Sequence, residues 1–162
     1  MGQIFKRQIH SHATSGKIIA VDIKPLHCLD IEAVKSISEI TFNKGWGEKD
    51  FAYFIAHDSG CCWGVFKEKR LIGYFLALLV QGELDIISVA VEKEFRRWGI
   101  AEMLLVLVWE LAEVKRAFLE VEAGNTPAIR LYEKVGYRQY GLRKKYYAGL
   151  KDAVVMKKEK VD

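Results

Sequence analysis

The chain has 162 residues, of which 51% are apolar and 28% charged, and its formal net charge is +4 at neutral pH. This length and composition suffice for one full hydrophobic core and are short for two, so we expect a single domain. The small positive excess permits an anionic ligand but falls short of the dense basic surface that marks nucleic-acid-binding proteins, so we expect no direct contact with nucleic acid.

Targeting and metal signals are missing from the sequence. Residues 1–17 are mixed polar and lack the apolar stretch of a secretory signal. The longest apolar run, Met103 to Trp109, is much shorter than the roughly 20 residues that a membrane-spanning helix needs. The three cysteines have no metal-ligand spacing. We therefore expect a reduced, cytoplasmic protein without a metal and without a membrane partner.

The N-terminal third is predicted to contain one strand and two helices. Residues 1–17 show no periodicity, and we expect a flexible tail there. Lys17 to Lys24 alternates as a strand does. Asp30 is a suitable N-cap for a helix that runs to about Thr41. Glu48 to His57 is expected to form a second, shorter helix.

The remaining sequence predicts an antiparallel meander of three strands and then alternating helices and strands. The expected elements are strands at 62–66, 71–80 and 83–91, a helix at 98–115, a strand at 117–123, a helix at 126–135, and strands at 137–147 and 153–158. Thr126 is expected to cap the second of these helices. This order is typical of an α/β protein in which helices cover a mixed sheet, with residues 18–162 forming one domain.

The segment between the strand at 83–91 and the helix at 98–115 has the composition of an anion site. A helix start carries unpaired N–H groups and a partial positive charge. Gly99 and Ala101 are small enough for phosphate oxygens to approach the backbone, and Arg96 and Arg97 can add charge-assisted hydrogen bonds. The alternative is that Gly99 only eases a tight turn between solvated arginines. The spacing matches neither the phosphate loop nor the dinucleotide fingerprint.

Two blocks of sequence together resemble one known family. Val89-Ala90-Val91 followed by Arg96-x-x-Gly99-x-Ala101 is similar to the acetyl-coenzyme A motif of the GNAT acetyltransferase superfamily. The second block, which extends from Leu119 to Met156, is similar to its N-terminal acetyltransferases, most closely the ribosomal-protein-alanine branch. Its matching residues are Leu119 to Asn125, Ala128, Leu131-Tyr132, Gly136-Tyr137, Arg143 to Tyr147, and Asp152 to Met156.

The resemblance implies a fold, a co-substrate and an activity. The fold would be a mostly antiparallel, mixed sheet of about seven strands with four helices, splayed where acetyl-coenzyme A binds. The acetyl group would pass by direct attack to the N-terminal α-amine of a protein, such as a ribosomal protein. The implied coenzyme-binding residues are Val89, Ala90, Val91, Arg96, Arg97, Trp98, Gly99, Ile100, Ala101, Asn125 and Tyr132.

Two glutamates are candidates for the general base. The two-residue period of a strand puts Glu120 and Glu122 on one face, about 6.5–7 Å apart along the chain. Like charges at that spacing make one carboxylate a better proton acceptor. Periodicity does not choose between them, and both fit solvated acids at a strand end equally well. The resemblance implies that Glu120 is the base, acting through water, and that Glu122 lies beside the acceptor.

Aromatic residues supply the other implied roles. By resemblance, Tyr132 protonates the departing coenzyme thiolate, although its helical spacing also suits an ordinary core position. Tyr146 and Tyr147 would line the peptide slot, or else form a plain strand pair. Asn125 would contact the pantetheine arm of the coenzyme, and a main-chain N–H near Val91 would stabilise the oxyanion.

The sequence departs from the family at two positions, with Glu122 and Gly124 where relatives generally have Arg and Ser. This change leaves the coenzyme motif intact and puts the acceptor preference in question. Two other functions therefore stay open: transfer to lysine side chains or small amines, and a non-catalytic module that binds coenzyme A, or binds RNA through the basic residues Arg143 to Lys145.

Overall fold

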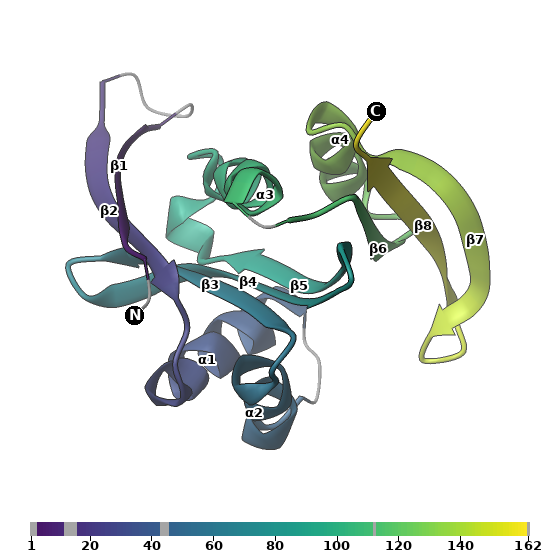
Figure 1. The fold of residues 1–162 in the computed structure, drawn as a ribbon, viewed down its shortest axis with the longest axis horizontal. Coiled ribbons are helices and arrows are strands. Elements are labelled where there is room, and N and C mark those ends of the chain that lie inside the picture. The colour runs from purple at the N-terminus through teal and green to yellow at the C-terminus, as the bar shows by residue number, and fades with distance from the viewer. Residues whose placement is uncertain (1–2, 12–15, 43–45, 112, 162) are drawn as a thin grey trace.

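The computed structural model describes residues 3–11, 16–42, 46–111 and 113–161. Their strands form a single eight-stranded sheet in the order β1-β2-β3-β4-β5-β6-β8-β7, in which only the β5–β6 pair is parallel (Figure 1). The strands are β1 (Phe5–His10), β2 (Ile18–Pro25), β3 (Gly60–Lys67), β4 (Arg70–Val80), β5 (Glu83–Val91), β6 (Arg116–Glu122), β7 (Arg138–Tyr147) and β8 (Lys151–Glu159).

Four α-helices cover the sheet, two on each face (Figure 1). Helices α1 (Ile31–Phe42) and α2 (Glu48–Ala56) lie on one face, and α3 (Ile100–Leu111) and α4 (Thr126–Lys134) lie on the other. The central strand β4 is buried on both sides, which explains its unbroken apolar sequence. Tyr74 and Leu76 pack in the cluster under α1 and α2, whereas Ile72 and Phe75 pack in the cluster under α3.

The sheet opens between β5 and β6. These strands pair only along Glu83–Ile86 and Arg116–Leu119. Beyond that point a bulge shifts the pairing of β5 with β4, so that Leu76 faces Ser88 and Ala77 faces Ile86. Because β5 continues along β4 while β6 continues along β8, the two strands part. This divergence confirms the splayed, mixed sheet that the sequence predicts.

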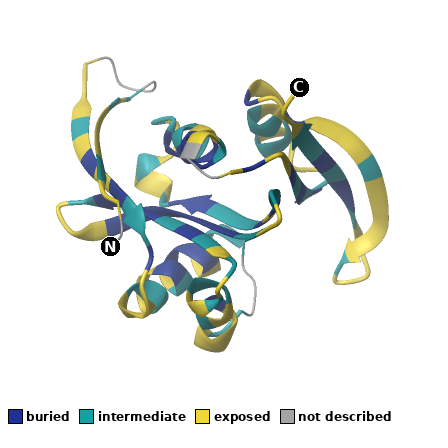
Figure 2. Cartoon of the chain, viewed as in Figure 1, coloured by how far each residue is buried: buried dark blue, intermediate teal, exposed yellow. Residues whose placement is uncertain are grey.

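Past the opening, strands β6, β8 and β7 curve away from the rest of the sheet (Figure 1). Helices α1 and α2 do not extend under them, so one face of this half-sheet has no helical cover. The outermost strand β7 is accordingly exposed along most of its length (Figure 2). Glu120 and Glu122 lie on the β6 face that is partly exposed, opposite the buried Leu119 and Val121.

The N-terminal segment departs from the prediction. Phe5–His10 forms strand β1, which pairs with β2 along its whole length, so the expectation of a tail without regular structure is wrong there. The sheet therefore begins at Phe5 rather than at residue 18 and has eight strands rather than about seven. Four of the six residues of this edge strand are exposed, so its sequence does not show the alternation of apolar and polar residues that predicts a strand. Residues 1–2 and 12–15 of the predicted tail lie outside the described part of the chain.

One helix start agrees with the prediction and another differs. Helix α1 begins at Ile31, directly after Asp30, as expected if Asp30 is its N-cap; Asp30 also ends a 3₁₀ turn, Cys28–Asp30, in which its carboxylate accepts the His27 N–H at 2.8 Å. The helix expected from Trp98 begins at Ile100, because Gly99 has a φ of +75° and still belongs to the turn. Its end, predicted near Lys115, lies at Leu111.

Candidate active site

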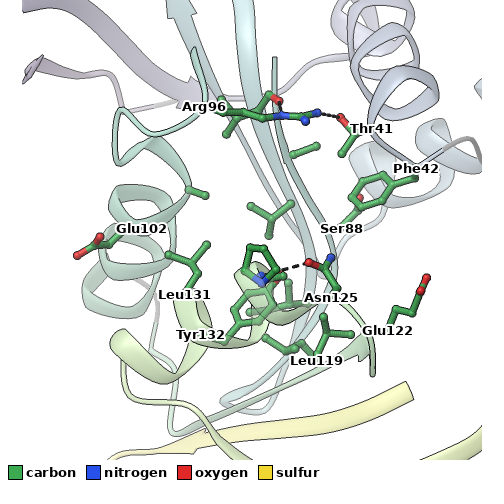
Figure 3. A pocket seen from close by; sticks show the side chains of 18 of the residues that line it. Thr41, Phe42, Ser88, Arg96, Glu102, Leu119, Glu122, Asn125, Leu131 and Tyr132 are labelled. Atoms are coloured by element: carbon green, nitrogen blue, oxygen red, sulfur yellow. Dashed lines mark hydrogen bonds between the residues drawn. The ribbon is translucent and has the colours of Figure 1, made fainter. Parts of the chain in front are cut away.

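A cavity of about 1110 Å³ occupies the opening between β5 and β6. Its walls include the diverging ends of the two strands, the start of α3, one side of α4 and the end of α1 (Figure 3). The tyrosines at the end of β7 also line it. All the predicted coenzyme residues line it except Trp98, which packs against Phe95 with ring centroids 6.2 Å apart. The predicted Glu120, Glu122, Tyr146 and Tyr147 line the same cavity.

The start of α3 presents unpaired backbone donors to this cavity. Arg97 and Gly99 have φ values of +65° and +75°, which turn the chain sharply between β5 and α3. Within the described residues, the N–H groups from Arg97 to Glu102 donate to no other backbone group, and Met103 N–H is the first to do so, to Gly99 O at 2.9 Å. A run of free N–H groups at a helix start is a site for a phosphate group.

The two arginines of this turn have different surroundings. Arg96 donates from Nε to the Val91 carbonyl oxygen at 3.2 Å and from a terminal nitrogen to Thr41 Oγ1 at 3.3 Å (Figure 3). Its guanidinium therefore ties the end of β5 to the end of α1, in addition to lining the cavity. Arg97 and Arg130 also line the cavity, with Lys134, whose ammonium group is 2.7 Å from Glu102 Oε2. These cations give the α3–α4 side a positive character.

Helix α4 directs Tyr132 into the cavity (Figure 3). Asn125, rather than the predicted Thr126, is its N-cap, and Asn125 Oδ1 accepts the Ala128 N–H at 3.2 Å. The side-chain nitrogen of Asn125 is then the group left to contact a ligand. Burial, and secondarily the nearby Tyr147, raises the pKa of Tyr132 to about 12, so the phenol carries its proton at neutral pH.

Each of the two glutamates has a cationic partner from the β7–β8 hairpin. Glu120 Oε1 lies 3.4 Å from a terminal nitrogen of Arg143, and Glu122 Oε1 lies 2.8 Å from Lys151 Nζ. These cations offset the mutual repulsion that the sequence alone suggests. Glu120 is the less exposed of the two, with 23% of its side chain accessible against 39% for Glu122.

Tyr146 and Tyr147 are neighbours on β7, with ring centroids 5.1 Å apart in an edge-to-face arrangement. Burial raises the pKa of Tyr147 to about 12, and Tyr146, Glu120 and Glu122 add smaller contributions in the same direction. The Tyr147 hydroxyl therefore stays protonated close to both carboxylates. A protonated phenol at the edge of a cavity is a hydrogen-bond donor for a bound backbone carbonyl.

An aromatic wall faces these residues from α1 and α2, and sequence reasoning did not identify it as part of the site. Phe42, Trp46 and Phe54 all line the cavity, and the Trp46 and Phe54 rings stack with centroids 5.8 Å apart. Ser88 also lines it, held by a 3.0 Å hydrogen bond to the Tyr74 hydroxyl. Only tertiary contact brings these residues together, so no local pattern in the sequence marks them as site residues.

The described residues provide neither a metal cluster nor a membrane-spanning helix. Across the described ranges, no group of three or more His, Cys, Asp or Glu side chains is placed to hold a metal ion. No described helix combines the length and apolar character needed to cross a bilayer. The free cysteines Cys28, Cys61 and Cys62 lie off the cavity.

Comparison with known proteins agrees with this geometry. The profile of the acetyltransferase (GNAT) family matches residues 31–137. An uncharacterised N-acetyltransferase of Methanocaldococcus jannaschii is 32% identical over 142 residues, which cover 85% of this chain and 91% of the relative. The ribosomal protein bS18-alanine N-acetyltransferase of Escherichia coli K12 is 29% identical over 140 residues, 83% of this chain and 94% of the relative.

Solved structures show the same fold. The crystal structure of the Escherichia coli ribosomal-protein-S18-alanine N-acetyltransferase superposes with a TM-score of 0.79 at 28% identity, over 86% of this chain and 93% of that one. The splayed sheet, the donor-rich start of α3 and the family match over most of the chain lead to one conclusion: the protein belongs to the GNAT acetyltransferase family.

Proposed function

We propose that the protein transfers the acetyl group of acetyl-coenzyme A to the N-terminal α-amine of a protein, such as a ribosomal protein. The observation that carries this proposal is the single cavity that joins the free N–H groups of α3 to the Glu120 carboxylate and the Tyr132 phenol. The relatives named for transfer to a ribosomal-protein alanine support the choice of acceptor.

The coenzyme side of the cavity is suited to a diphosphate and an extended arm. The N–H groups from Arg97 to Glu102 are the donors for the diphosphate, and Arg97 and Arg130 add positive charge. The arm then lies in the gap between β5 and β6, near the side-chain nitrogen of Asn125. A main-chain N–H near Val91 is the donor for the oxyanion of the tetrahedral intermediate.

The acceptor side supplies the groups for proton transfer. The amine nitrogen attacks the thioester carbon, Glu120 takes the amine proton through water, and the C–S bond breaks as Tyr132 donates a proton to the sulfur. A protein α-amine has an ordinary pKa of about 7.7–8.0 against about 10.4 for lysine, so a modest base is sufficient for an N-terminus. Attack is direct, because none of the three cysteines lies at the cavity to form an acyl-enzyme.

The peptide itself would lie between the hairpin and the helices. Tyr146 and Tyr147 are placed to donate to its backbone, and the aromatic wall of Phe42, Trp46 and Phe54 would contact its first side chain. Glu122 stands at the edge of the same space.

The proposal is tested by mass spectrometry of alanine-initiated peptides incubated with enzyme and acetyl-coenzyme A. We expect the mass gain of one acetyl group at the α-amine, and no gain on a matched peptide with a blocked terminus and an internal lysine. Glu120→Gln is expected to lower the rate by about 10²–10⁴-fold, as the loss of a general base does.

The matched control is Glu68→Gln in the β3–β4 turn, whose carboxylate lies off the cavity and which is expected to keep wild-type activity. Acetylation of the internal lysine in preference to the α-amine would assign the enzyme to side-chain acceptors instead. A fully active Glu120→Gln variant would remove Glu120 from the base role while leaving the fold assignment intact.

A further inference from the structure

Glu122 and Lys151 form an ion pair at the edge of the cavity. Glu122 Oε1 lies 2.8 Å from Lys151 Nζ, and the two side chains are 39% and 62% exposed. Figure 3 shows Glu122 on the same side of the cavity as Phe42 and across from Glu102 at the start of α3. Glu122 is therefore a negative group on the acceptor side that a bound peptide can reach.

The Lys151 partner is easily displaced. Exposed ion pairs between long side chains contribute little to stability, because they are screened by water and restrict flexible groups. Lys151 lies at the first position of β8, beside the β7–β8 turn. Its ammonium group has Glu122 as its one partner among the contacts of the described residues. Another cation that reaches Glu122 can thus replace it at little cost.

The neighbouring cation Arg143 is held differently. It pairs with Glu120 at 3.4 Å, and it also lies near Asp85 on β5. Burial, with Glu83, raises the pKa of Asp85, and the charge of Arg143 acts in the opposite direction. Arg143 therefore interacts with two carboxylates on two strands, whereas Lys151 interacts with one. Of the two pairs, Glu122–Lys151 is the one that can exchange its cation without unpairing a third group.

We infer that Glu122 selects acceptors with Arg or Lys as their second residue, whose side chain takes the place of Lys151. This inference rests on the proposed function, since it puts the α-amine at Glu120. Glu120 and Glu122 are about 6.5–7 Å apart along β6, and an extended peptide advances about 3.3 Å per residue. If the amine lies at Glu120 and the peptide runs along β6, its second residue lies about half of the way to Glu122, and the long side chain of Arg or Lys spans the remaining distance.

The test compares three peptides that differ only in their second residue, Ala-Arg, Ala-Gln and Ala-Glu. The wild-type enzyme is expected to prefer Arg over Gln by about two- to fivefold in kcat/KM, the range of one exposed charge pair, and to use Glu least. Glu122→Gln should bring the Arg-to-Gln ratio close to one, and Glu122→Lys should reverse the order. Lys151→Gln, which removes the competing cation, should widen the preference for Arg.

The control Glu68→Gln should leave the ranking unchanged. A wild-type ranking in Glu122→Gln would overturn the inference, and so would an equal loss for all three peptides, since that outcome assigns Glu122 to folding or chemistry. Calorimetric binding of the same peptides to the coenzyme A complex provides a second measurement without turnover. A charge ranking in binding without acetyl transfer would refute the proposed function and show only that Glu122 binds basic peptides, whereas transfer without any ranking would refute the inference alone.

Discussion

Tyr132 shows how burial prepares one side chain for a chemical role. Its ring lines the cavity, and desolvation holds its pKa near 12. A phenol in that environment keeps its proton at neutral pH, so the proton is available to hydrogen-bond and then transfer to a thiolate that forms beside it. Tyr147, at the acceptor edge, has a similar pKa and a more open position, which suits hydrogen bonding to a substrate.

Tyr132→Phe is expected to lower kcat by about 10²–10⁴-fold with little change in coenzyme affinity, because the ring remains and only the proton donor is lost. In the wild-type enzyme, Tyr132 should cause no decline in rate as the pH rises from about 7 to 10, since its pKa lies near 12. Steady-state kinetics with calorimetry check both points. The control Tyr140→Phe removes an exposed hydroxyl that does not line the cavity. A Phe variant with wild-type kcat would rule out proton donation by Tyr132.

Several site residues could be predicted from the sequence and others could not. Gly99, Asn125 and Tyr132 belong to short motifs, so their place at the cavity follows from local order along the chain. The cationic partners of Glu120 and Glu122 could not be predicted from local order. Arg143 and Lys151 come to lie beside β6 only because of the way β7 pairs with β8 and β8 pairs with β6. The two hydrogen bonds of Arg96, to the Val91 carbonyl oxygen and to Thr41 Oγ1, likewise depend on how α1 packs near the end of β5.

At the scale of elements, the proposed coenzyme site depends on the turn between β5 and α3. Gly99 takes a φ of +75°, a region that costs other residues roughly 1–2 kcal/mol. The N–H groups from Arg97 to Glu102, in this turn and in the first residues of α3, have no backbone acceptor among the described residues. An anion site here therefore depends on one backbone conformation more than on the two arginines.

Gly99→Ala is expected to lower stability by about 1–2 kcal/mol and to weaken coenzyme binding, because the new side chain disfavours the turn that exposes the donors. Gly149→Ala is the matched control: its φ of +69° gives a similar backbone cost, open space surrounds it, and it lies in the β7–β8 turn, off the cavity. Urea unfolding measures stability and calorimetry measures affinity. Equal coenzyme affinity in both variants would contradict the importance of the turn.

Element prediction succeeded where apolar periods are strong and failed at an edge. The helices and the strands from β2 to β8 lie close to their predicted ranges, and most of them bury at least one face, although β7 and α4 do not. Strand β1 was missed because most of its side chains face solvent and its stability comes from backbone pairing with β2. Cap positions also shifted by one residue, as at Asn125, where two adjacent residues are both good N-caps.

At the scale of the whole molecule, several tyrosines are buried as neutral phenols. Burial raises the pKa of Tyr74 and Tyr137, and that of Tyr132 and Tyr147 to about 12, above the ordinary value of 10. Between about pH 10 and 12 the unfolded chain therefore releases protons that the folded protein retains, and stability must fall as the pH rises.

We expect the free energy of unfolding to decline slightly above about pH 8.5, where the buried Cys61 and Cys62 thiols keep protons that the unfolded chain releases, and more steeply above about pH 10, with tyrosine ionisation accompanying the loss of structure. Urea unfolding at a series of pH values, with tyrosine absorbance as a second signal, measures both. Tyr137→Phe should reduce the decline, since it removes one of the raised groups. Tyrosines that titrate fully near pH 10 in a protein still folded would contradict the burial of these phenols.

The divergence of β5 and β6 leaves unpaired strand edges inside the sheet. Unpaired strand borders usually lie at the outside of a sheet, where they invite pairing with other chains. Here Ile87 to Val91 and Glu120 to Glu122 provide two such borders in the interior, recessed between α3, α4 and the flanking strands. A narrow, extended ligand can add hydrogen bonds along them. The protein thus offers a template for binding inside the sheet, away from the outer strands where sheets of different molecules usually pair.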